Sequence, residues 1–284
     1  MIYRDFKGQK ISGLGMGMMR LPVIDGDDSK VDEKQAEKMI AYAMEHGVNY
    51  YDTAWGYHGE TSENVAGKFL NKYPRSSYCL ASKFPGYDNS NMPKVKEIFE
   101  KQLEKCNTEY FDFYLLHNVY EGNIDDYLDP KFGILDYLLE QKQAGRIRHL
   151  GFSCHGTVDI IRRFMESPYG RHMEFCQLQL NYMDWHFQKC DEKAAYCREM
   201  GLPVFVMEPV RGGKICEAPD EMREQLKKMR PDESDIGWAF RFIQTIPDVV
   251  VTLTGASSLV QLQQNISIWE EDKPLNEEEF SRLL

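Results

Sequence analysis

Short apolar runs alternate along the chain with stretches whose apolar residues recur at helical spacing. Ala36, Met39, Ile40 and Ala43 form the first such helical stripe, and an apolar run at residues 48–51 follows it. This alternation continues to the C-terminal region. It predicts strands at residues 11–14, 48–51, 78–81, 111–116, 147–152, 175–178, 203–206 and 249–253.

Amphipathic helices are predicted between these strands. They cover residues 32–47, 65–70, 95–106, 134–139, 158–165, 193–200, 221–242 with a break near Pro231, and 259–269. Strands that are apolar on both faces and separated by helices imply a parallel sheet. Eight such units in about 250 residues favour a closed (β/α)₈ TIM barrel over an open sheet. A β-hairpin is expected before the barrel, with strands at 2–6 and 10–12.

The composition is that of a globular protein and narrows the classes of partner. The 284 residues are 42% hydrophobic and 28% charged, and no shift in composition divides them, so we expect one domain over residues 1–284. Acidic residues outnumber basic ones by 45 to 34, which gives a net charge of −11. Such a surface repels phosphate backbones, so no nucleic-acid partner is expected, although a local cleft can still bind an anionic cofactor.

Membrane and export signals are not apparent in the sequence. No apolar run approaches the roughly 20 residues of a membrane helix. Charged residues stand among the first seven, where a signal peptide would be apolar. We therefore expect a cytoplasmic protein without a membrane partner.

Several common catalytic and metal-binding patterns are missing. The seven cysteines are scattered and contain no C-x-x-C pair, so neither a disulfide framework nor a metal site is expected. H-E-x-x-H, P-loop and G-x-S-x-G patterns do not occur, which argues against metalloproteases, NTPases and α/β-hydrolases. The glycines at 13, 15 and 17 lack the G-x-x-G spacing of a Rossmann motif.

Ionisable side chains stand at the ends of consecutive predicted strands. Asp52, Lys83 and His117 each end a strand, and Tyr57 lies in the loop after the first of them. Each alone has a structural explanation: a turn cap, a surface lysine, a buried histidine and a loop-packing tyrosine. Barrel enzymes, however, build their active sites at the C-terminal strand ends. The joint occurrence of these four groups therefore favours a catalytic site.

The sequence resembles the aldo-keto reductases from Gly15 to Asn265. Residues 51–57, Tyr-Asp-Thr-Ala-Trp-Gly-Tyr, are similar to the D-T-A-x-x-Y signature of that family. Residues 82–83, Ser-Lys, and 115–118, Leu-Leu-His-Asn, are similar to its lysine and histidine segments. The resemblance implies hydride transfer between a nicotinamide cofactor and a carbonyl or alcohol.

The resemblance also implies a role for each catalytic residue. Tyr57 is the expected general acid, because the carbonyl oxygen gains negative charge as the hydride arrives. Lys83 is expected to stabilise the phenolate and to lower the tyrosine pKa from its reference value near 10. Asp52 would keep Lys83 charged, and His117 would orient the substrate oxygen.

A cofactor site for NADP(H), with NAD(H) as the alternative, follows from the same resemblance. Ser153 and Gln177 match positions that contact the nicotinamide carboxamide, with Asn181 beside them. Met207 is expected beside the nicotinamide ring. The loops after the seventh and eighth strands are expected to hold the diphosphate and the adenosine, through Pro209, Val210, Arg211, Gly212, Gly213, Gly255, Ala256, Ser257, Gln261, Gln264 and Asn265. The Gly-Gly pair could also be an ordinary turn, and the serines at 257 and 258 could cap the final helix.

Two departures from the family pattern concern the cofactor. Met207 stands where many members carry an aromatic residue that stacks on the nicotinamide. Gly255 and Gln261 replace a lysine and an arginine that often bind the 2′-phosphate, which weakens the expectation of strict NADP(H) preference.

The expected function is reduction of small aldehydes or ketones, with Trp55 and Met18 in the substrate pocket. Two alternatives remain open. One is a nicotinamide-binding regulatory or redox-sensing protein with little turnover. The other is a truncated iron–sulfur-linked oxidoreductase, because relatives with similar segments at 18–22 and 181–184 carry a cysteine-rich, ferredoxin-like C-terminal extension. That alternative implies an electron-transfer partner or a missing extension beyond Leu284.

Overall fold

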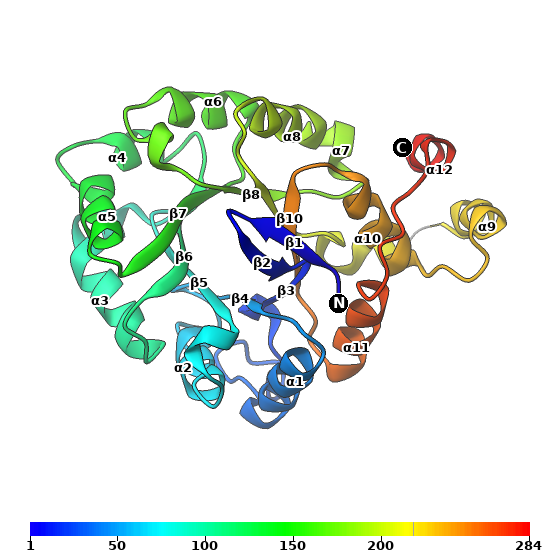
Figure 1. The fold of residues 1–284 in the computed structure, drawn as a ribbon, viewed down its shortest axis with the longest axis horizontal. Helices are drawn as coiled ribbons and strands as arrows, with labels where there is room; N and C mark the ends of the chain where they lie inside the picture. The colour runs from blue at the N-terminus through cyan, green and yellow to red at the C-terminus, as the bar shows by residue number, and fades with distance from the viewer. Residues whose placement is uncertain (218) are drawn as a thin grey trace.

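Eight parallel strands close into a barrel, and helices follow them along the chain (Figure 1). The computed structural model describes residues 1–217 and 219–284. Each strand pairs with its neighbour in chain order, and the last pairs with the first. The prediction of a (β/α)₈ barrel is therefore confirmed. The strands are β3 (Leu14–Gly17), β4 (Tyr50–Asp52), β5 (Cys79–Phe84), β6 (Phe111–Val119), β7 (Ile147–Cys154), β8 (Cys176–Gln179), β9 (Val204–Met207) and β10 (Val249–Thr254).

The helices form an outer ring around these strands. The principal ones are α1 (Glu33–Glu45), α2 (Ser62–Leu70), α3 (Val95–Lys105), α5 (Ile134–Gln143), α6 (Val158–Glu166), α8 (Cys190–Glu199), α10 (Asp235–Thr245) and α11 (Leu259–Ile268). Others lie in connections or at the C-terminus: α4 (Ile124–Leu128), α7 (Asp184–Phe187), α9 (Asp220–Met229), α12 (Glu277–Leu283), and the 3₁₀ turns Met18–Arg20, Arg75–Ser77, Asn89–Lys94, Gly170–His172 and Arg211–Glu217.

Local chemistry sets several helix boundaries. The Asp32 side chain accepts the backbone N–H of Gln35 and so caps α1, as the sequence predicts. Ser234 caps α10 in the same way. The break expected near Pro231 is confirmed, because α9 ends at Met229 and α10 begins at Asp235. The sequence did not reveal α4, α7 and α12, which are too short to show a full helical stripe.

The N-terminal hairpin, β1 (Tyr3–Phe6) and β2 (Gln9–Ser12), covers one end of the barrel (Figure 1). The Phe6 ring is 1% exposed and lies 5.3 Å from Phe113, 6.2 Å from Phe175 and 5.6 Å from Phe205, centroid to centroid. These partners come from the N-terminal parts of the strands. The hairpin therefore closes the N-terminal end of the barrel.

A partly buried carboxylate fastens the hairpin turn to the barrel. Glu174 pairs with Lys7 of the turn at 2.6 Å, with His149 at 2.9 Å and with Lys142. Burial raises the pKa of Glu174, but the hydrogen bonds from His149, Lys142 and Lys7 outweigh this effect and hold the pKa well below its usual value. Glu174 is therefore ionised at neutral pH.

The first barrel strand differs from the prediction. A strand was expected at residues 11–14, but β2 ends at Ser12 and β3 begins at Leu14. Gly13 separates them, and a Cβ on this residue would lie 2.7 Å from the Trp269 ring. Because glycine has no side chain, the backbone can pass close to Trp269 as it leaves the hairpin and enters the barrel. The apolar run at residues 11–14 is therefore divided between the hairpin and the barrel sheet.

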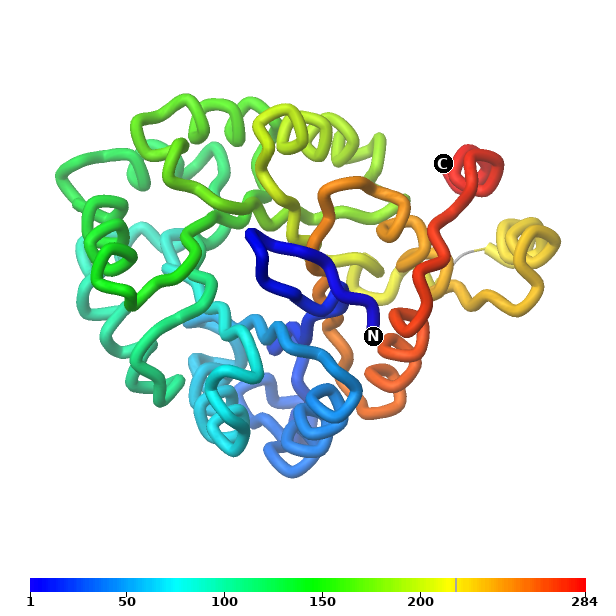
Figure 2. Tube along the Cα trace, in the orientation of Figure 1, coloured from blue at the N-terminus to red at the C-terminus, as the bar shows by residue number. Residues whose placement is uncertain are grey.

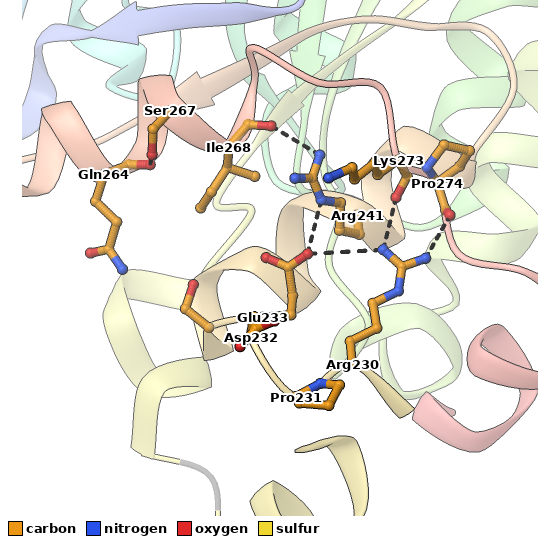
Figure 3. Close-up of a pocket in the computed structure, with 11 residues that line it drawn as sticks. Arg230, Pro231, Asp232, Glu233, Arg241, Gln264, Ser267, Ile268, Lys273 and Pro274 are labelled. Carbon is orange, nitrogen blue, oxygen red and sulfur yellow. Dashed lines mark hydrogen bonds and ion pairs between the residues drawn. The ribbon is translucent and has the colours of Figure 1, made fainter. Parts of the chain in front are cut away.

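A cavity of about 710 Å³ lies beside the barrel, at α10, α11 and the C-terminal segment that Figure 2 traces from α11 to α12. Arg230 pairs with Glu279 at 2.7 Å and donates to the carbonyl oxygens of Lys273 and Pro274. Arg241 pairs with Glu233 at 3.1 Å (Figure 3). These arginines serve to hold the C-terminal segment against the barrel.

Within residues 1–217 and 219–284, no helix has both the length and the apolar character needed to cross a membrane. The same residues contain no cluster of three or more His, Cys, Asp or Glu side chains arranged to hold a metal ion. The cysteines carry free thiols, and all except Cys216 are buried.

Candidate active site

The four predicted catalytic side chains meet at the C-terminal end of the barrel. Lys83 Nζ lies 2.5 Å from Asp52 Oδ1, 2.8 Å from the carbonyl oxygen of Thr53 and 3.5 Å from Tyr57 Oη. Its side chain is 0% exposed, and that of Asp52 is 3% exposed. The ammonium group is therefore the centre of the cluster, with the carboxylate on one side and the phenol on the other.

The charge of Lys83 depends on its neighbours. Burial lowers the pKa of Lys83, but the charge of Asp52 and the hydrogen bonds to Asp52 and Tyr57 outweigh this effect and raise the pKa above its usual value. The side chain therefore carries a proton and a positive charge at neutral pH.

The pKa of Tyr57 departs from the expectation. Lys83 lowers it, as predicted, but burial has the larger effect and leaves the pKa above its usual value. The predicted net decrease is therefore wrong. Burial in the folded chain, which the sequence does not show, disfavours the phenolate more than the ammonium favours it. Tyr57 is consequently a protonated phenol at neutral pH.

A bulge in β6 sets the direction of His117. Leu116 pairs with Phe152 and Val119 with Cys154, so β6 holds one more residue than β7 between these pairs. Asn118, inside the bulge, has a left-handed backbone with φ of 55°. Bulges of this kind change the direction of a side chain beside an active site.

His117 lies between two phenol rings. Tyr57 and Tyr87 meet its ring edge-on, with centroids 5.8 and 5.1 Å away. Burial lowers the pKa of His117 well below its usual value, and the charge of Lys83 lowers it further. Its Nδ1 atom is buried without a hydrogen-bond partner in the described residues. The imidazole is therefore neutral and able to bind an added polar group.

A second network of buried polar side chains, from helices α2 and α3, contacts the strand that carries Lys83. Gln102 donates to the carbonyl oxygen of Lys83 at 2.9 Å and to Glu63 at 2.7 Å. Glu63 also pairs with Lys105 at 3.0 Å, and the Lys105 ammonium lies 4.4 Å from the centre of the Trp55 ring. The network thus connects the lysine strand to Trp55, a predicted substrate-pocket residue.

Comparison with known proteins identifies the family. The model of the "Aldo/keto reductase family" matches residues 13–283. The chain belongs to the aldo/keto reductase family. It is 25% identical over 303 residues to the "Uncharacterized oxidoreductase YqkF" of Bacillus subtilis, covering 96% of this chain and 92% of that protein.

Other aldo/keto reductases and relatives carry more specific names. The "NADH-specific methylglyoxal reductase" of Escherichia coli is 25% identical to this chain over 225 residues. The aligned region covers 72% of this chain and 65% of that protein. The holo form of the Bacillus halodurans aldo-keto reductase AKR11C1 superposes with a TM-score of 0.80, at 24% identity, over 100% of this chain and 95% of its own. A Klebsiella pneumoniae aldo-keto reductase in complex with NADPH superposes with a TM-score of 0.76, at 18% identity. The superposition covers 100% of this chain and 94% of that chain.

Two of the predicted nicotinamide contacts lie next to the catalytic cluster. Ser153 accepts the backbone N–H of Asn118 at 2.8 Å, so it also holds the β6 bulge. Gln177 donates to the Met207 sulfur at 3.8 Å. Its Oε1 atom is buried without a partner in the described residues. An acceptor of this kind fits a carboxamide N–H group.

The loop after β9 is held by buried polar contacts. Asn181 donates to the carbonyl oxygen of Glu208 at 3.1 Å and to Asp184 at 2.8 Å. Arg211, predicted to bind the cofactor, lies 3.5 Å from Asp184 and over the Phe187 ring. Its charge is therefore partly neutralised by Asp184.

The two glycines of this loop have a backbone that other residues rarely adopt. The φ angle is 65° at Gly212 and 97° at Gly213. The N–H of Gly213 donates to the carbonyl oxygen of Val210. Pro209 is buried and Val210 packs against the core, so both lie beneath the loop rather than on its outer surface.

The loop after β10 combines a helix cap with a buried amide. Ser258 caps α11, and the backbone N–H of Ser257 donates to Gln261 at 2.8 Å. Asn265 donates to Thr254 at 2.7 Å, while its Oδ1 atom is buried without a partner in the described part of the chain. Ala256 and Gly255 precede the cap, at the end of β10.

Two predicted positions lie elsewhere. Met18 is 0% exposed and belongs to the hydrophobic core, so it offers no surface to a substrate in this structure. Gln264 lines the cavity beside α10 (Figure 3), whereas the next residue, Asn265, is buried against Thr254. Periodicity could have separated these two α11 residues, because neighbouring residues of a helix point about 100° apart.

The structure also adds residues that the sequence did not single out. Tyr127 donates to the carbonyl oxygen of His117 at 2.8 Å and so fixes the bulge from the helix side. The edge-on contact of Tyr87 with His117 places a second phenol ring at the site. The 3₁₀ turn after β3 brings Arg20 beside Gly212 and Gly255. No motif marks Tyr87 and Tyr127, and the resemblance of residues 18–22 to other proteins assigns no role to Arg20; tertiary packing brings all three to the barrel mouth.

Proposed function

We propose that this single-domain protein reduces small aldehydes or ketones to alcohols with NADPH or NADH, and that Tyr57 donates the proton. The observation that carries the proposal is the buried Lys83 ammonium, which hydrogen-bonds to both Asp52 and Tyr57. A structural lysine would need only the carboxylate. The second contact places a positive charge where a phenolate would form.

The residues at the barrel mouth fit a nicotinamide dinucleotide. The side-chain oxygens of Gln177 and Asn265 are buried acceptors without partners in the described residues. In the sequence, Gln177 precedes the Gly212–Gly213 loop and Asn265 follows it. The former suits the carboxamide and the latter suits the adenosine part. The E. coli relative named for NADH and the Klebsiella structure with NADPH support both cofactors.

The chemistry divides among few groups. The nicotinamide, when bound, would supply the hydride that the carbonyl carbon receives. Tyr57 Oη passes its proton to the carbonyl oxygen, and Lys83 stabilises the phenolate that remains. Asp52 holds Lys83 in position and keeps it charged. Tyr57 then regains a proton from solvent.

The raised pKa of Tyr57 suits this role, because the acid must be protonated before the reaction. The neutral His117 complements it. Since its pKa lies well below the usual value, His117 orients the carbonyl oxygen by a hydrogen bond and does not compete as the acid.

Turnover of reduced cofactor tests the proposal. Purified protein is mixed with NADPH or NADH and a panel of small aldehydes and ketones, and cofactor consumption and alcohol formation are followed together. We expect many equivalents of alcohol per protein, and no turnover by Lys83→Met, which removes the ammonium. Tight cofactor binding with at most one equivalent of alcohol would contradict the proposal and indicate a sensor.

A further inference from the structure

Arg20 is a cation at the mouth of the barrel that has no partner in the described residues. It ends the 3₁₀ turn Met18–Arg20 directly after β3, and its side chain is exposed. It forms no hydrogen bond or ion pair within residues 1–217 and 219–284. Most other arginines of this acidic chain, Arg211 included, pair with a carboxylate. An unpaired guanidinium here is available for an anion.

The position of the Arg20 side chain is defined by two glycines. Its Cδ atom lies 3.4 Å from the point where a Cβ on Gly255 would stand, and its Nη2 atom lies 3.4 Å from the corresponding point on Gly212. The aliphatic stem therefore crosses the loop after β10, and the guanidinium reaches the loop after β9. Arg20 spans the two loops that the proposed function assigns to the cofactor.

We propose that Arg20 is a positioning residue that binds the diphosphate of the nicotinamide dinucleotide from across the barrel mouth. The guanidinium ends at the Gly212 loop, and its planar N–H groups match two phosphate oxygens at once. Arg211 is engaged with Asp184, so Arg20 adds to this loop a guanidinium that pairs with no carboxylate in the described residues. This inference rests on the proposed function.

The anchoring of Arg20 supports a built site rather than a loose surface arginine. The backbone N–H of the next residue, Leu21, donates to Nε2 of the buried His58 at 3.0 Å. Nδ1 of His58 lies 2.9 Å from the carbonyl oxygen of Asp28. The ring thus joins two parts of the connection between β3 and α1. The base of the Arg20 side chain is therefore fixed while its head is free.

Equilibrium binding tests the role without any turnover. The dissociation constants of NADPH, NADH and ADP-ribose are measured by fluorescence for the wild type, Arg20→Gln and Arg20→Lys. Loss of charged hydrogen bonds to phosphate should weaken binding of all three ligands by a similar factor, about tenfold to a hundredfold in the Gln variant. The Lys variant should fall between, because it keeps the charge and loses the two-pronged geometry.

Arg171→Gln is the matched control. Arg171 is also exposed and without a carboxylate partner among the described residues, and it precedes β8, at the far end of the barrel. The variant has the same net charge as Arg20→Gln and should bind all three ligands like the wild type. Raised salt should weaken the wild type more than Arg20→Gln, because an exposed charge pair is screened.

Unchanged affinities in Arg20→Gln, with normal binding by the wild type, would overturn the role of Arg20 alone. A loss confined to NADPH would also overturn it, since that result would assign Arg20 to the 2′-phosphate. A wild type that binds none of the ligands would refute the proposed function itself, and this inference with it.

Discussion

Removing the negative charge beside Lys83 tests how the catalytic cluster is held together. Asp52→Asn keeps the shape of the side chain but removes the charge that lies 2.5 Å from the ammonium. Lys83 keeps the Thr53 carbonyl at 2.8 Å as an acceptor. It loses the only carboxylate within 4.0 Å of it in the described residues. The variant therefore leaves a buried charge without a counter-charge.

The size of the effect follows from the burial of both groups. Removing one partner of a buried ion pair destabilises a protein by about 3–5 kcal/mol. Lys83 could instead lose its proton on folding, which at pH 7 costs about 4.6 kcal/mol for a reference pKa near 10.4. Both routes give a loss of roughly 3–5 kcal/mol in the free energy of unfolding.

The second route also predicts a dependence on pH. If Lys83 is neutral in the folded variant, its folded pKa is below its unfolded pKa, and the unfolded state binds more protons. Stability then rises with pH. The deficit of Asp52→Asn relative to the wild type should therefore shrink between pH 7 and pH 9.

Urea unfolding of matched variants measures these differences. Asp125→Asn removes the charge of an exposed pair with Arg163 and should change the midpoint little. The double variant Asp52→Leu/Lys83→Met removes both buried charges and should lose far less stability than Asp52→Asn. A deficit for Asp52→Asn below about 1 kcal/mol, or a double variant less stable than the single one, would refute the reasoning.

Three further predictions concern other groups. The pKa of the Glu174 carboxylate is lowered, so its contribution to the free energy of unfolding is present above the unfolded pKa near 4.3 and is lost as the pH falls toward the folded pKa. The stability advantage of the wild type over Glu174→Gln should therefore shrink below about pH 5. An advantage that does not depend on pH would count against this. His117 should not titrate near the reference pKa of about 6.5 in NMR experiments, with its signal assigned by His117→Gln, and a midpoint there would contradict the lowered pKa. Gly13→Ala should lower the urea midpoint by the equivalent of about 1–3 kcal/mol, because the new Cβ would overlap the buried Trp269 ring; an unchanged midpoint would argue against that close packing.

The sequence predicts the framework of this protein well because the framework depends on periodic burial. Apolar strands and amphipathic helices alternate visibly, and the strand ends carry Asp52, Lys83 and His117. Once a barrel is inferred, these three must share one end of it. The loop tyrosine follows from its motif.

Features that depend on three-dimensional packing were not accessible in the same way. The bulge at Asn118 needs a left-handed residue and the Ser153 acceptor on the next strand, which no local pattern indicates. The net pKa shift of Tyr57 depends on burial by the folded chain. Arg20 lies beside residues about 190 and 235 positions away in the sequence, and only the closed barrel brings them together.

The role of Tyr57 is the central claim, and single-turnover hydride transfer tests it most directly. Enzyme loaded with reduced cofactor is mixed with an aldehyde, and cofactor oxidation is followed for the wild type, Tyr57→Phe and the distant control Tyr42→Phe on α1. Tyr57→Phe should bind cofactor within about twofold of the wild type and transfer hydride about 10²- to 10⁴-fold more slowly, while the control should match the wild type. Hydride transfer at the wild-type rate in Tyr57→Phe would contradict the account.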